Sequence, residues 1–225
     1  MKRAPDKRPE ENMNIISVLI FIAAVISAYL IGSIPTGFLM TRMIKGVDIR
    51  GVGSKNVGAT NVYRVAGKLP GLLTLIIDIV KGVLVVTVIA GGFYAFLQDM
   101  DYVFFRAFLG LIAIGGHIWS VFLKFKGGKG VATTIGVTAI LAPIPLALSL
   151  LAWLGIFIPT NYVSLGSLFF GLSLPIFSVI FNEPFYVVIF CVTICLLNTY
   201  KHKDNIARLL KGMENKTILF KTRLR

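Results

Sequence analysis

The sequence predicts an all-α, polytopic integral membrane protein with about seven transmembrane helices, its N-terminus outside and its C-terminus cytoplasmic. The chain has 225 residues, of which 56% are hydrophobic and only 15% are charged, whereas a soluble domain carries about 25% charged residues. The apolar residues form long runs, and about 20 such residues cross a bilayer once. The basic residues, which give a net charge of +13, lie between those runs.

The positive charge excludes some partners and indicates others. Proteins that bind nucleic acid carry their basic residues as a patch on a mostly polar chain, so we expect no nucleic-acid partner. Lysines and arginines between apolar runs are typical of cytoplasmic loops, which face membrane lipids and anionic substrates. The chain has two histidines and no cluster of carboxylates, so we also expect no metal and no cofactor.

The chain divides by composition into a disordered polar lead over residues 1–13, a single transmembrane domain over 14–216 and a basic tail over 217–225. Pro143 and Pro145 interrupt one long apolar run, which favours two short helices with a turn between them. The expected helices cover residues 15–40, 69–97, 103–125, 131–158 as two segments, 162–181 and 185–197.

The first apolar run contains Pro35, and the second contains two charged residues. The run 15–40 is too long for the core of a signal peptide, so we predict an uncleaved helix in spite of Pro35, followed by a polar loop over 41–68. Asp78 and Lys81 lie inside the second run, where charges are costly and by default functional. They can also pair with each other in a purely structural role, and the sequence leaves both interpretations open.

The distribution of basic residues predicts the orientation. The loop 41–68 carries six lysines and arginines, and the segment from Lys201 to the end of the chain carries eight. The polar lead carries four, partly neutralised by acidic neighbours, and opposes this assignment. Because basic residues are in excess on the cytoplasmic side, the larger total places the C-terminus and the polar motifs in the cytoplasm.

The first motif, residues 51–64, combines glycines, small hydroxyls, two asparagines and two cations without any acidic residue. Glycine allows a backbone to approach an anion closely, while Ser54, Asn56, Asn61 and Arg64 supply hydrogen-bond donors. The alternative is an ordinary cytoplasmic loop, but such loops rarely combine so many donors with so little acid. The motif therefore favours an anion site.

The second motif, Gly127-Gly128-Lys129-Gly130, directly precedes an apolar run. Free N–H groups at a helix start, together with one lysine, form a phosphate site. The motif is not a Walker A loop, which would need glycine in place of Leu123 and serine or threonine in place of Gly130. The alternative is a basic turn that only marks the cytoplasmic side.

Two further motifs are weaker when taken alone. Ser164 lies at the start of a span, where small residues usually serve helix packing. His202, Asn205 and Arg208 are spaced three apart, so they share one face of a helix that leaves the membrane. The alternative for these three is a basic tail that lies on the lipid surface.

Two reaction patterns are absent from the sequence. A His-x4-Asp acyltransferase motif needs aspartate five residues after histidine, but Phe122 follows His117 at that distance and Ala207 follows His202. The Gly-x-Ser-x-Gly nucleophile elbow is also absent. A reaction that relies on either pattern is excluded.

The motifs together resemble the bacterial acyl-phosphate:glycerol-3-phosphate acyltransferases, the PlsY family. The matching stretches are Gly53-Ser54-x-Asn56-x-Gly58-Ala59-Thr60-Asn61-Val62-x-Arg64, Gly127-Gly128-Lys129-Gly130-Val131-Ala132-Thr133 and His202-x-x-Asn205-Ile206-x-Arg208-Leu209-Leu210-x-Gly212-x-Glu214. The resemblance covers about residues 32–216. One departure is Lys55, where the family usually has glycine.

The resemblance implies a seven-helix protein of the bacterial cell (inner or plasma) membrane with its active site on the cytoplasmic face. It implies transfer of a fatty acyl group from acyl phosphate to the 1-hydroxyl of glycerol 3-phosphate, which gives lysophosphatidic acid for phospholipid synthesis. The implied catalytic residues are Ser54, Arg64, His202 and Asn205; those for substrate binding are Asn56, Asn61, Gly127, Gly128, Lys129, Gly130 and Ser164; and Glu214 is structural.

The chemistry of acyl phosphate agrees with this set. The donor is already activated, so positioning two phosphates and a carbonyl supplies much of the rate without a covalent nucleophile. Lys201 and Lys203 favour a neutral His202, which leaves open whether it takes a proton or only holds a hydrogen bond. The competing class is a membrane carrier for phosphorylated small solutes, but a carrier needs polar lining on both sides of the bilayer.

Overall fold

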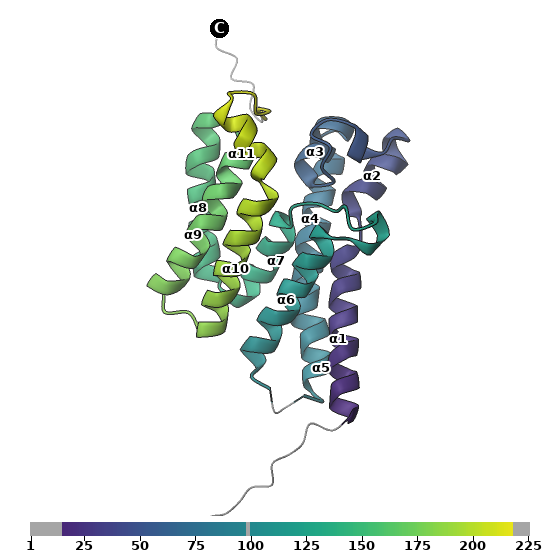
Figure 1. Cartoon of the computed structure of the whole chain (residues 1–225), viewed down its shortest axis with the longest axis vertical. Helices are drawn as coiled ribbons and strands as arrows, with labels where there is room; N and C mark the ends of the chain where they lie inside the picture. The colour runs from purple at the N-terminus through teal and green to yellow at the C-terminus, as the bar shows by residue number, and fades with distance from the viewer. Residues whose placement is uncertain (1–14, 98–99, 218–225) are drawn as a thin grey trace, which may run out of the picture.

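The computed structural model describes residues 15–97 and 100–217, and this part of the chain contains helices and no strands (Figure 1). The polar lead 1–13 and all but the first residue of the basic tail lie outside the described residues. The helices are α1 (Ile15–Ser33), α2 (Thr36–Lys45), α3 (Ala59–Ala66), α4 (Lys68–Leu84), α5 (Ala90–Tyr94), α6 (Tyr102–Ile118), α7 (Val131–Leu141), α8 (Pro143–Thr160), α9 (Val163–Ile180), α10 (Phe185–Lys201) and α11 (Lys203–Leu210).

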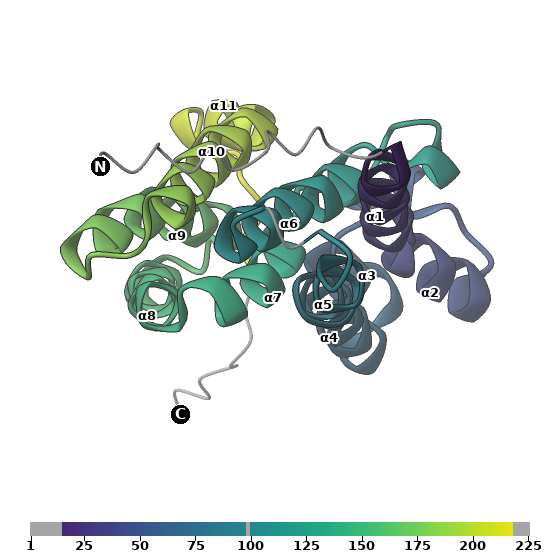
Figure 2. The same ribbon diagram turned by 90° about the horizontal axis from the view of Figure 1, so that it is seen from below.

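Helix α6 lies in the middle of the bundle, with α1, α4 and α5 on one side and α8, α9 and α10 on the other (Figure 2). Phe105 and Leu109 of α6 join one buried apolar cluster, and Ile114 and Ile118 of the same helix join the other. Many of the large apolar side chains of the outer helices are instead exposed, as expected for surfaces that face lipid tails.

The predicted first helix 15–40 is in fact two helices, because the chain breaks at Ile34 and Pro35. Proline lacks an N–H and disfavours helical geometry in the residue before it. A break at membrane depth leaves carbonyls that need donors. The Ser120 hydroxyl donates to the Ser33 carbonyl at 2.6 Å, and the Lys81 amine donates to the Ile34 carbonyl at 3.2 Å.

The predicted pair of helices over 131–158 is confirmed, although the two are unequal. The break falls at Ala142, and Pro143 occupies the first position of α8, where its missing N–H costs nothing. Helix α7 has 11 residues, so it rises only about 16 Å, roughly half of the hydrocarbon core.

The prediction of a polar loop over 41–68 is wrong in part. Helix α2 continues to Lys45, and α3 forms over 59–66 before α4 begins at Lys68. Helix α3 is short and amphipathic, and it buries Asn61 and Val62. Sequence reasoning missed it because its apolar face covers only two turns.

The number of seven spanning helices is not reached within the described residues. Five helical segments are long and apolar enough to cross a membrane: 15–45, 68–94, 102–123, 143–160 and 163–180. A sixth is obtained if α10 and α11, which are bent by 57°, count as one broken span. The shortness of α7 accounts for the missing segment.

Glycines allow the closest helix contacts in the bundle. A Cβ on Gly116 of α6 would lie 2.4 Å from the Tyr29 carbonyl oxygen of α1, and one on Gly136 of α7 would lie 2.0 Å from the Ile79 carbonyl oxygen of α4. In membranes, where lipid tails compete with side chains, such small residues let backbones approach. A Cβ on the neighbouring Gly115 would meet no atom within 4 Å.

We therefore expect Gly116→Ala to lower the Tm of the detergent-solubilised protein, because α1 must move away and overpacking costs about 1–3 kcal/mol. Gly115→Ala is the matched control and should leave the Tm unchanged or raise it slightly, since alanine favours helix. Thermal unfolding followed by circular dichroism measures both. Equal Tm values for the two variants would contradict the α1–α6 packing.

Candidate functional site

The first motif folds around the buried side chain of Asn61. Its Oδ1 accepts a hydrogen bond from the Ser54 N–H at 2.9 Å, and its Nδ2 donates to the carbonyls of Val52 at 3.0 Å and Asn56 at 2.9 Å. The Asn56 Oδ1 accepts from the Gly58 N–H at 2.8 Å. Both amides, which the sequence assigned to substrate binding, are thus used in shaping the loop.

This fold gives Ser54 and Lys55 their geometry. Within the described residues the Ser54 hydroxyl makes no hydrogen bond, so it is available to a ligand. Lys55 has a φ of 58°, in the left-handed region that glycine tolerates best. That conformation is the physical reason why glycine suits this position.

Arg64 projects from α3 toward the C-terminal end of the chain. Its guanidinium donates to the Thr217 hydroxyl at 2.6 Å and to the Asn215 carbonyl at 3.2 Å. Its Nε is buried and has no hydrogen-bond partner among the described residues. Burial lowers the pKa of Arg64, against the opposing charge of Glu214. A buried cation with a donor to spare suits an anionic ligand.

The second motif lies against the end of α6. The Gly127 N–H donates to the Ile118 carbonyl at 3.1 Å, and the Gly128 N–H donates to the His117 carbonyl at 3.0 Å. A Cβ on either glycine would lie within 2.3 Å of an atom of His117. The N–H groups of these two glycines are therefore used by the fold, and the close approach of the backbone explains why glycine is needed.

The free donors of the second motif come after the glycine pair. Gly130 caps the start of α7 with a φ of 82°. Within the described residues, the N–H groups of Lys129, Gly130 and Val131 have no hydrogen-bond partner. They add the positive end of a helix to the Lys129 amine.

A buried carboxylate joins the remaining site residues. Glu214 accepts hydrogen bonds from the Ser164 hydroxyl at 2.8 Å, the Asn205 amide at 2.6 Å and the Arg208 guanidinium at 2.7 Å. The Oδ1 of Asn205 accepts in turn from the Lys129 amine. Ser164 is thus a partner of Glu214, and this arrangement supports a structural role for the carboxylate.

Electrostatics around this carboxylate favour charge on the acid and disfavour it on the lysine. Burial alone would raise the pKa of Glu214, but hydrogen bonds from Asn205, Arg208 and Ser164 outweigh it and the net pKa is lowered. Burial lowers the pKa of Lys129 to about 8, and the nearby cations Arg208 and Arg64 add to the effect. An anion bound beside Lys129 would restore its charge.

His202 lies at the junction of α10 and α11, outside both helices, and is 2% exposed. Burial, followed by the charge of Lys129, lowers its pKa to about 4, so the imidazole is neutral. The neutral form was expected, but its cause is burial and Lys129 and not the adjacent Lys201 and Lys203. The Nδ1 lies 2.8 Å from the Asn198 carbonyl, which can only accept, so Nδ1 carries the proton and Nε2 is an acceptor.

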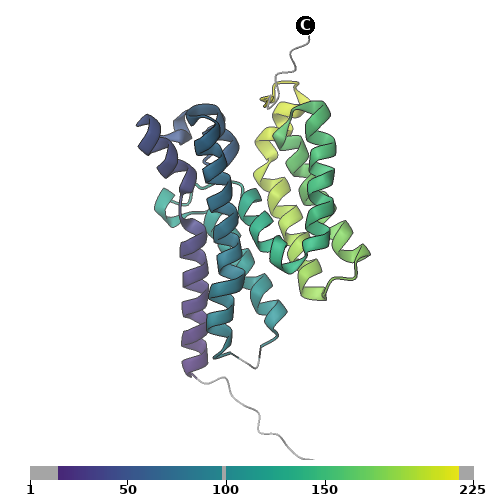
Figure 3. The same cartoon turned by 180° about the vertical axis from the view of Figure 1, so that it is seen from behind.

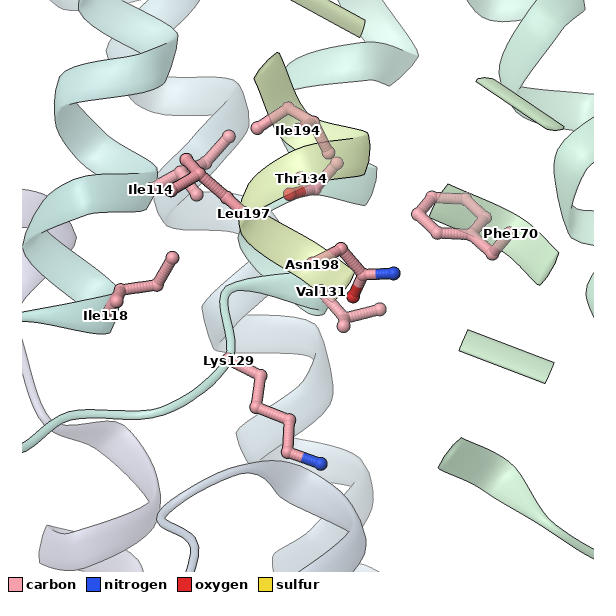
Figure 4. A pocket seen from close by; sticks show the side chains of 9 residues that line it. All are labelled: Ile114, Ile118, Lys129, Val131, Thr134, Phe170, Ile194, Leu197 and Asn198. Carbon is pink, nitrogen blue, oxygen red and sulfur yellow. The ribbon is translucent and has the colours of Figure 1, made fainter. Parts of the chain in front are cut away.

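Beside Lys129 the helices enclose an apolar pocket. Its lining residues, drawn in Figure 4, are Ile114, Ile118, Lys129, Val131, Thr134, Phe170, Ile194, Leu197 and Asn198. The Lys129 side chain extends away from the apolar residues. The Asn198 Oδ1 is buried without a hydrogen-bond partner among the described residues. Polar groups thus border one end of an apolar space.

The structure brings together Lys129, Asn205, Glu214 and Ser164 by direct contacts, with His202 and Arg64 within electrostatic range. Ser54 lies in the loop that precedes α3, and α3 and α11 are at the same end of the bundle (Figure 1), but within the described residues Ser54 makes no hydrogen bond to these residues. Sequence reasoning missed Asn198 and Thr217 as supports. The only available signal for Asn198 was its position four residues before His202.

Comparison with known proteins gives this site a family. Residues 22–212 match the family model described as glycerol-3-phosphate acyltransferase. The chain is 43% identical over 195 residues to the glycerol-3-phosphate acyltransferase of Desulforamulus reducens, which covers 87% of this chain and 94% of the relative. It is 42% identical to that of Halalkalibacterium halodurans, over 85% of this chain and 93% of the relative.

The chain belongs to the glycerol-3-phosphate acyltransferase family. Its fold is also similar to crystal structures of PlsY, an integral membrane glycerol 3-phosphate acyltransferase. The glycerol 3-phosphate form has a TM-score of 0.79 at 41% identity and covers 88% of this chain and 95% of that one. The lysophosphatidic acid form has a TM-score of 0.76 at 40% identity, covering 87% and 94%.

For this family member we expect Glu214→Ala to reduce acyltransferase activity by at least tenfold. The change leaves Asn205, Arg208 and Ser164 without their acceptor, and hydrogen bonds to a charged group contribute about 1.5–3 kcal/mol each. Asp204→Ala is the control, because Asp204 is an exposed acid on α11, the helix that carries Asn205 and Arg208. An assay of lysophosphatidic acid formation measures both, and equal activities would contradict the central position of Glu214.

Proposed function

We propose that this chain transfers a fatty acyl group from acyl phosphate to the 1-hydroxyl of glycerol 3-phosphate. The products are lysophosphatidic acid and inorganic phosphate, and the hydroxyl proton leaves with the released phosphate. The observation that carries the proposal is the Lys129–Asn205–Glu214 network at the start of α7. The relatives are glycerol-3-phosphate acyltransferases by name, and similar structures hold glycerol 3-phosphate and lysophosphatidic acid.

The site offers separate features for the two substrates. Lys129 and the free N–H groups at the start of α7 suit a dianionic phosphate. The pocket beside Lys129 is too small for an acyl tail, so the tail of an amphiphilic donor would lie along the exposed apolar surface of the helices. Acyl phosphate combines a phosphate with such a tail, and it needs no covalent nucleophile from the protein.

We assign the catalytic roles to Ser54, Arg64, His202 and Asn205. The Ser54 hydroxyl and the Arg64 guanidinium supply donors for charge that develops on the attacked acyl phosphate. The Nε2 of His202 accepts a hydrogen bond from the attacking hydroxyl. A pKa of about 4 is far below the pH at which a general base works best, so orientation of the hydroxyl is its main contribution.

The remaining site residues shape the backbone of the site or support its side chains. Gly127 and Gly128 let the backbone pass close to His117, and Gly130 starts α7 with left-handed geometry. Asn56 folds the first motif, and Ser164 supports Glu214. The reaction so described needs no metal and no cofactor.

The donor itself is the first test. Purified protein in detergent should form lysophosphatidic acid from acyl phosphate and labelled glycerol 3-phosphate, and it should not use acyl-CoA or acyl-carrier protein, because the thioester-type His-x4-Asp motif is absent. Thin-layer chromatography of the labelled product decides. Turnover with acyl-CoA and none with acyl phosphate would overturn the proposed donor.

Lys129→Ala should raise the KM for glycerol 3-phosphate by about ten- to a hundredfold, the equivalent of about 1.5–3 kcal/mol for a charge-assisted contact. Because the pKa of Lys129 is lowered to about 8, the affinity of the wild type should fall as pH rises from 7 to 9. Lys129→Arg should remove this pH dependence, since arginine stays charged. Calorimetric titration with glycerol 3-phosphate at three pH values measures the effect.

His202→Ala provides the contrast to Lys129→Ala. It should lower kcat more than it raises the KM for glycerol 3-phosphate, because its hydrogen bond strengthens as the hydroxyl attacks. An unchanged KM in Lys129→Ala together with a change confined to KM in His202→Ala would reverse the two assignments.

We further propose that the chain lies in the bacterial cell membrane with its N-terminus outside and its site on the cytoplasmic face, with α7 as the seventh membrane segment. The basic residues of 41–68 and of the chain from Lys201 support this. Single cysteines at Lys68 and Lys216 in a cysteine-free background should resist an impermeant thiol reagent in intact cells. Labelling of both from outside would overturn the orientation.

A further inference from the structure

Away from the proposed catalytic residues, three ionisable side chains are buried together in the bundle. Asp78 and Lys81 lie on α4 and His117 lies in the last turn of α6. They are 1%, 4% and 8% exposed, respectively. Charges at such depth are costly and persist where they are paired and used. The sequence left open whether Asp78 and Lys81 have a functional or a purely structural role.

The Lys81 amine is the centre of this cluster. It lies 2.9 Å from the Asp78 carboxylate, 2.9 Å from His117 Nδ1 and 3.2 Å from the Ile34 carbonyl oxygen. An ammonium can only donate, so it donates to the Ile34 carbonyl and to His117 Nδ1 and forms an ion pair with the Asp78 carboxylate. His117 Nδ1 must therefore accept, which places the imidazole proton on Nε2 and fixes both the tautomer and the ring orientation.

The ring fixed in this way touches the second motif. A Cβ built on Gly128 would lie 2.3 Å from His117 Nε2, 3.0 Å from Cδ2 and 3.3 Å from Cε1. The imidazole thus lies directly against the α-carbon that precedes Lys129. The backbone carbonyl of His117 also accepts the Gly128 N–H. Lys81 is connected through His117 to the backbone that carries the Lys129 amine.

The cluster also reaches the support of the first motif. The Ile34 carbonyl that Lys81 holds lies at the break from which α2 leads into the first motif loop. Val57 of that loop lines one small pocket together with Asp78 and His117. The Lys81 ammonium therefore contacts Ile34, which precedes α2 and the first motif, and His117, which packs against the second motif.

We propose that Lys81 and His117 are positioning residues for the acyl transfer, and that they act by fixing the Gly127–Lys129 backbone through the contact of the His117 imidazole with Gly128. The inference rests on the proposed function of the site. It assigns no direct substrate contact to either residue. Its distinctive consequence is that the effect of a Gly128 substitution on the KM for glycerol 3-phosphate depends on the side chain at position 117.

The two neighbouring glycines provide a matched test. The three atoms nearest to a Cβ on Gly128 all belong to the His117 side chain, whereas a Cβ on Gly127 would lie 2.1 Å from the His117 carbonyl oxygen, which every residue retains. In the His117→Ala background, Gly128→Ala should therefore be accommodated and Gly127→Ala should not. The KM for glycerol 3-phosphate, kcat and the calorimetric Kd are measured for the wild type, the three single variants and the two double variants.

We expect Gly128→Ala to raise the KM about tenfold in the wild type and by less than about twofold in His117→Ala, which is a large coupling for residues in contact. Gly127→Ala should raise the KM by the same factor in both backgrounds. A factor for Gly128→Ala that is also the same in both backgrounds overturns the inference.

Lys81 is tested by removing its charge without leaving Asp78 unpaired. The pair Asp78→Asn and Lys81→Met should raise the KM, and adding His117→Ala should raise it little further, because Lys81 acts through His117. If the factors by which these changes raise the KM simply multiply, the claim that Lys81 acts through His117 is overturned. The Tm of each variant is measured as well. If the Asp78→Asn, Lys81→Met variant is folded at the assay temperature and shows no rise in the KM for glycerol 3-phosphate, the inference is overturned.

The wild type separates this inference from the proposed function. If it forms no lysophosphatidic acid from acyl phosphate and does not bind glycerol 3-phosphate, the proposed function fails and the inference fails with it. If the wild type turns over and the His117–Gly128 cycle is multiplicative, only the inference fails.

Discussion

The hydrogen bonds that Glu214 accepts hold together the C-terminal half of the site. Ser164 comes from α9, Asn205 and Arg208 come from α11, and Asn205 extends the network to Lys129 at the start of α7. A buried polar group without a partner is costly, so the loss of one member leaves the others unpaired. Three helices and one loop are thereby fixed relative to one another by a single carboxylate.

The charge at this site is not balanced by the protein. Lys129, Arg64 and Arg208 surround Glu214, and burial lowers the pKa of both Lys129 and Arg64. Their cationic forms are therefore less favoured in the empty site than in water. A phosphate dianion supplies the missing charge, and its binding is strengthened because it also relieves this cost. Preorganised donors of this kind stabilise charge without reorganising during the reaction.

Interrupted helices bring these groups to one end of the bundle. The break at Pro35 turns the chain into α2 and the first motif, and the short α7 starts part-way across the bundle with its N-terminus at the second motif. Figure 3 shows α2, α3 and α11 at the same end when the molecule is seen from behind. Backbone left unpaired by such breaks needs donors at membrane depth. Ser120 and Lys81 supply them at the break before Pro35.

The sequence alone determined the membrane class, the break before Pro143 and the three motifs, because apolar runs, prolines and glycine-rich polar segments are local signals. It did not reveal that α3 lies within the polar loop or that α7 has only 11 residues. Only the tertiary structure decided which donors already have partners in the protein. Asn61 donates to the loop backbone, Ser164 donates to Glu214, and Lys81 contacts Asp78, His117 and the Ile34 carbonyl. The physical reason is that a motif gives the kinds of polar groups present, whereas their availability to a ligand depends on partners distant in sequence.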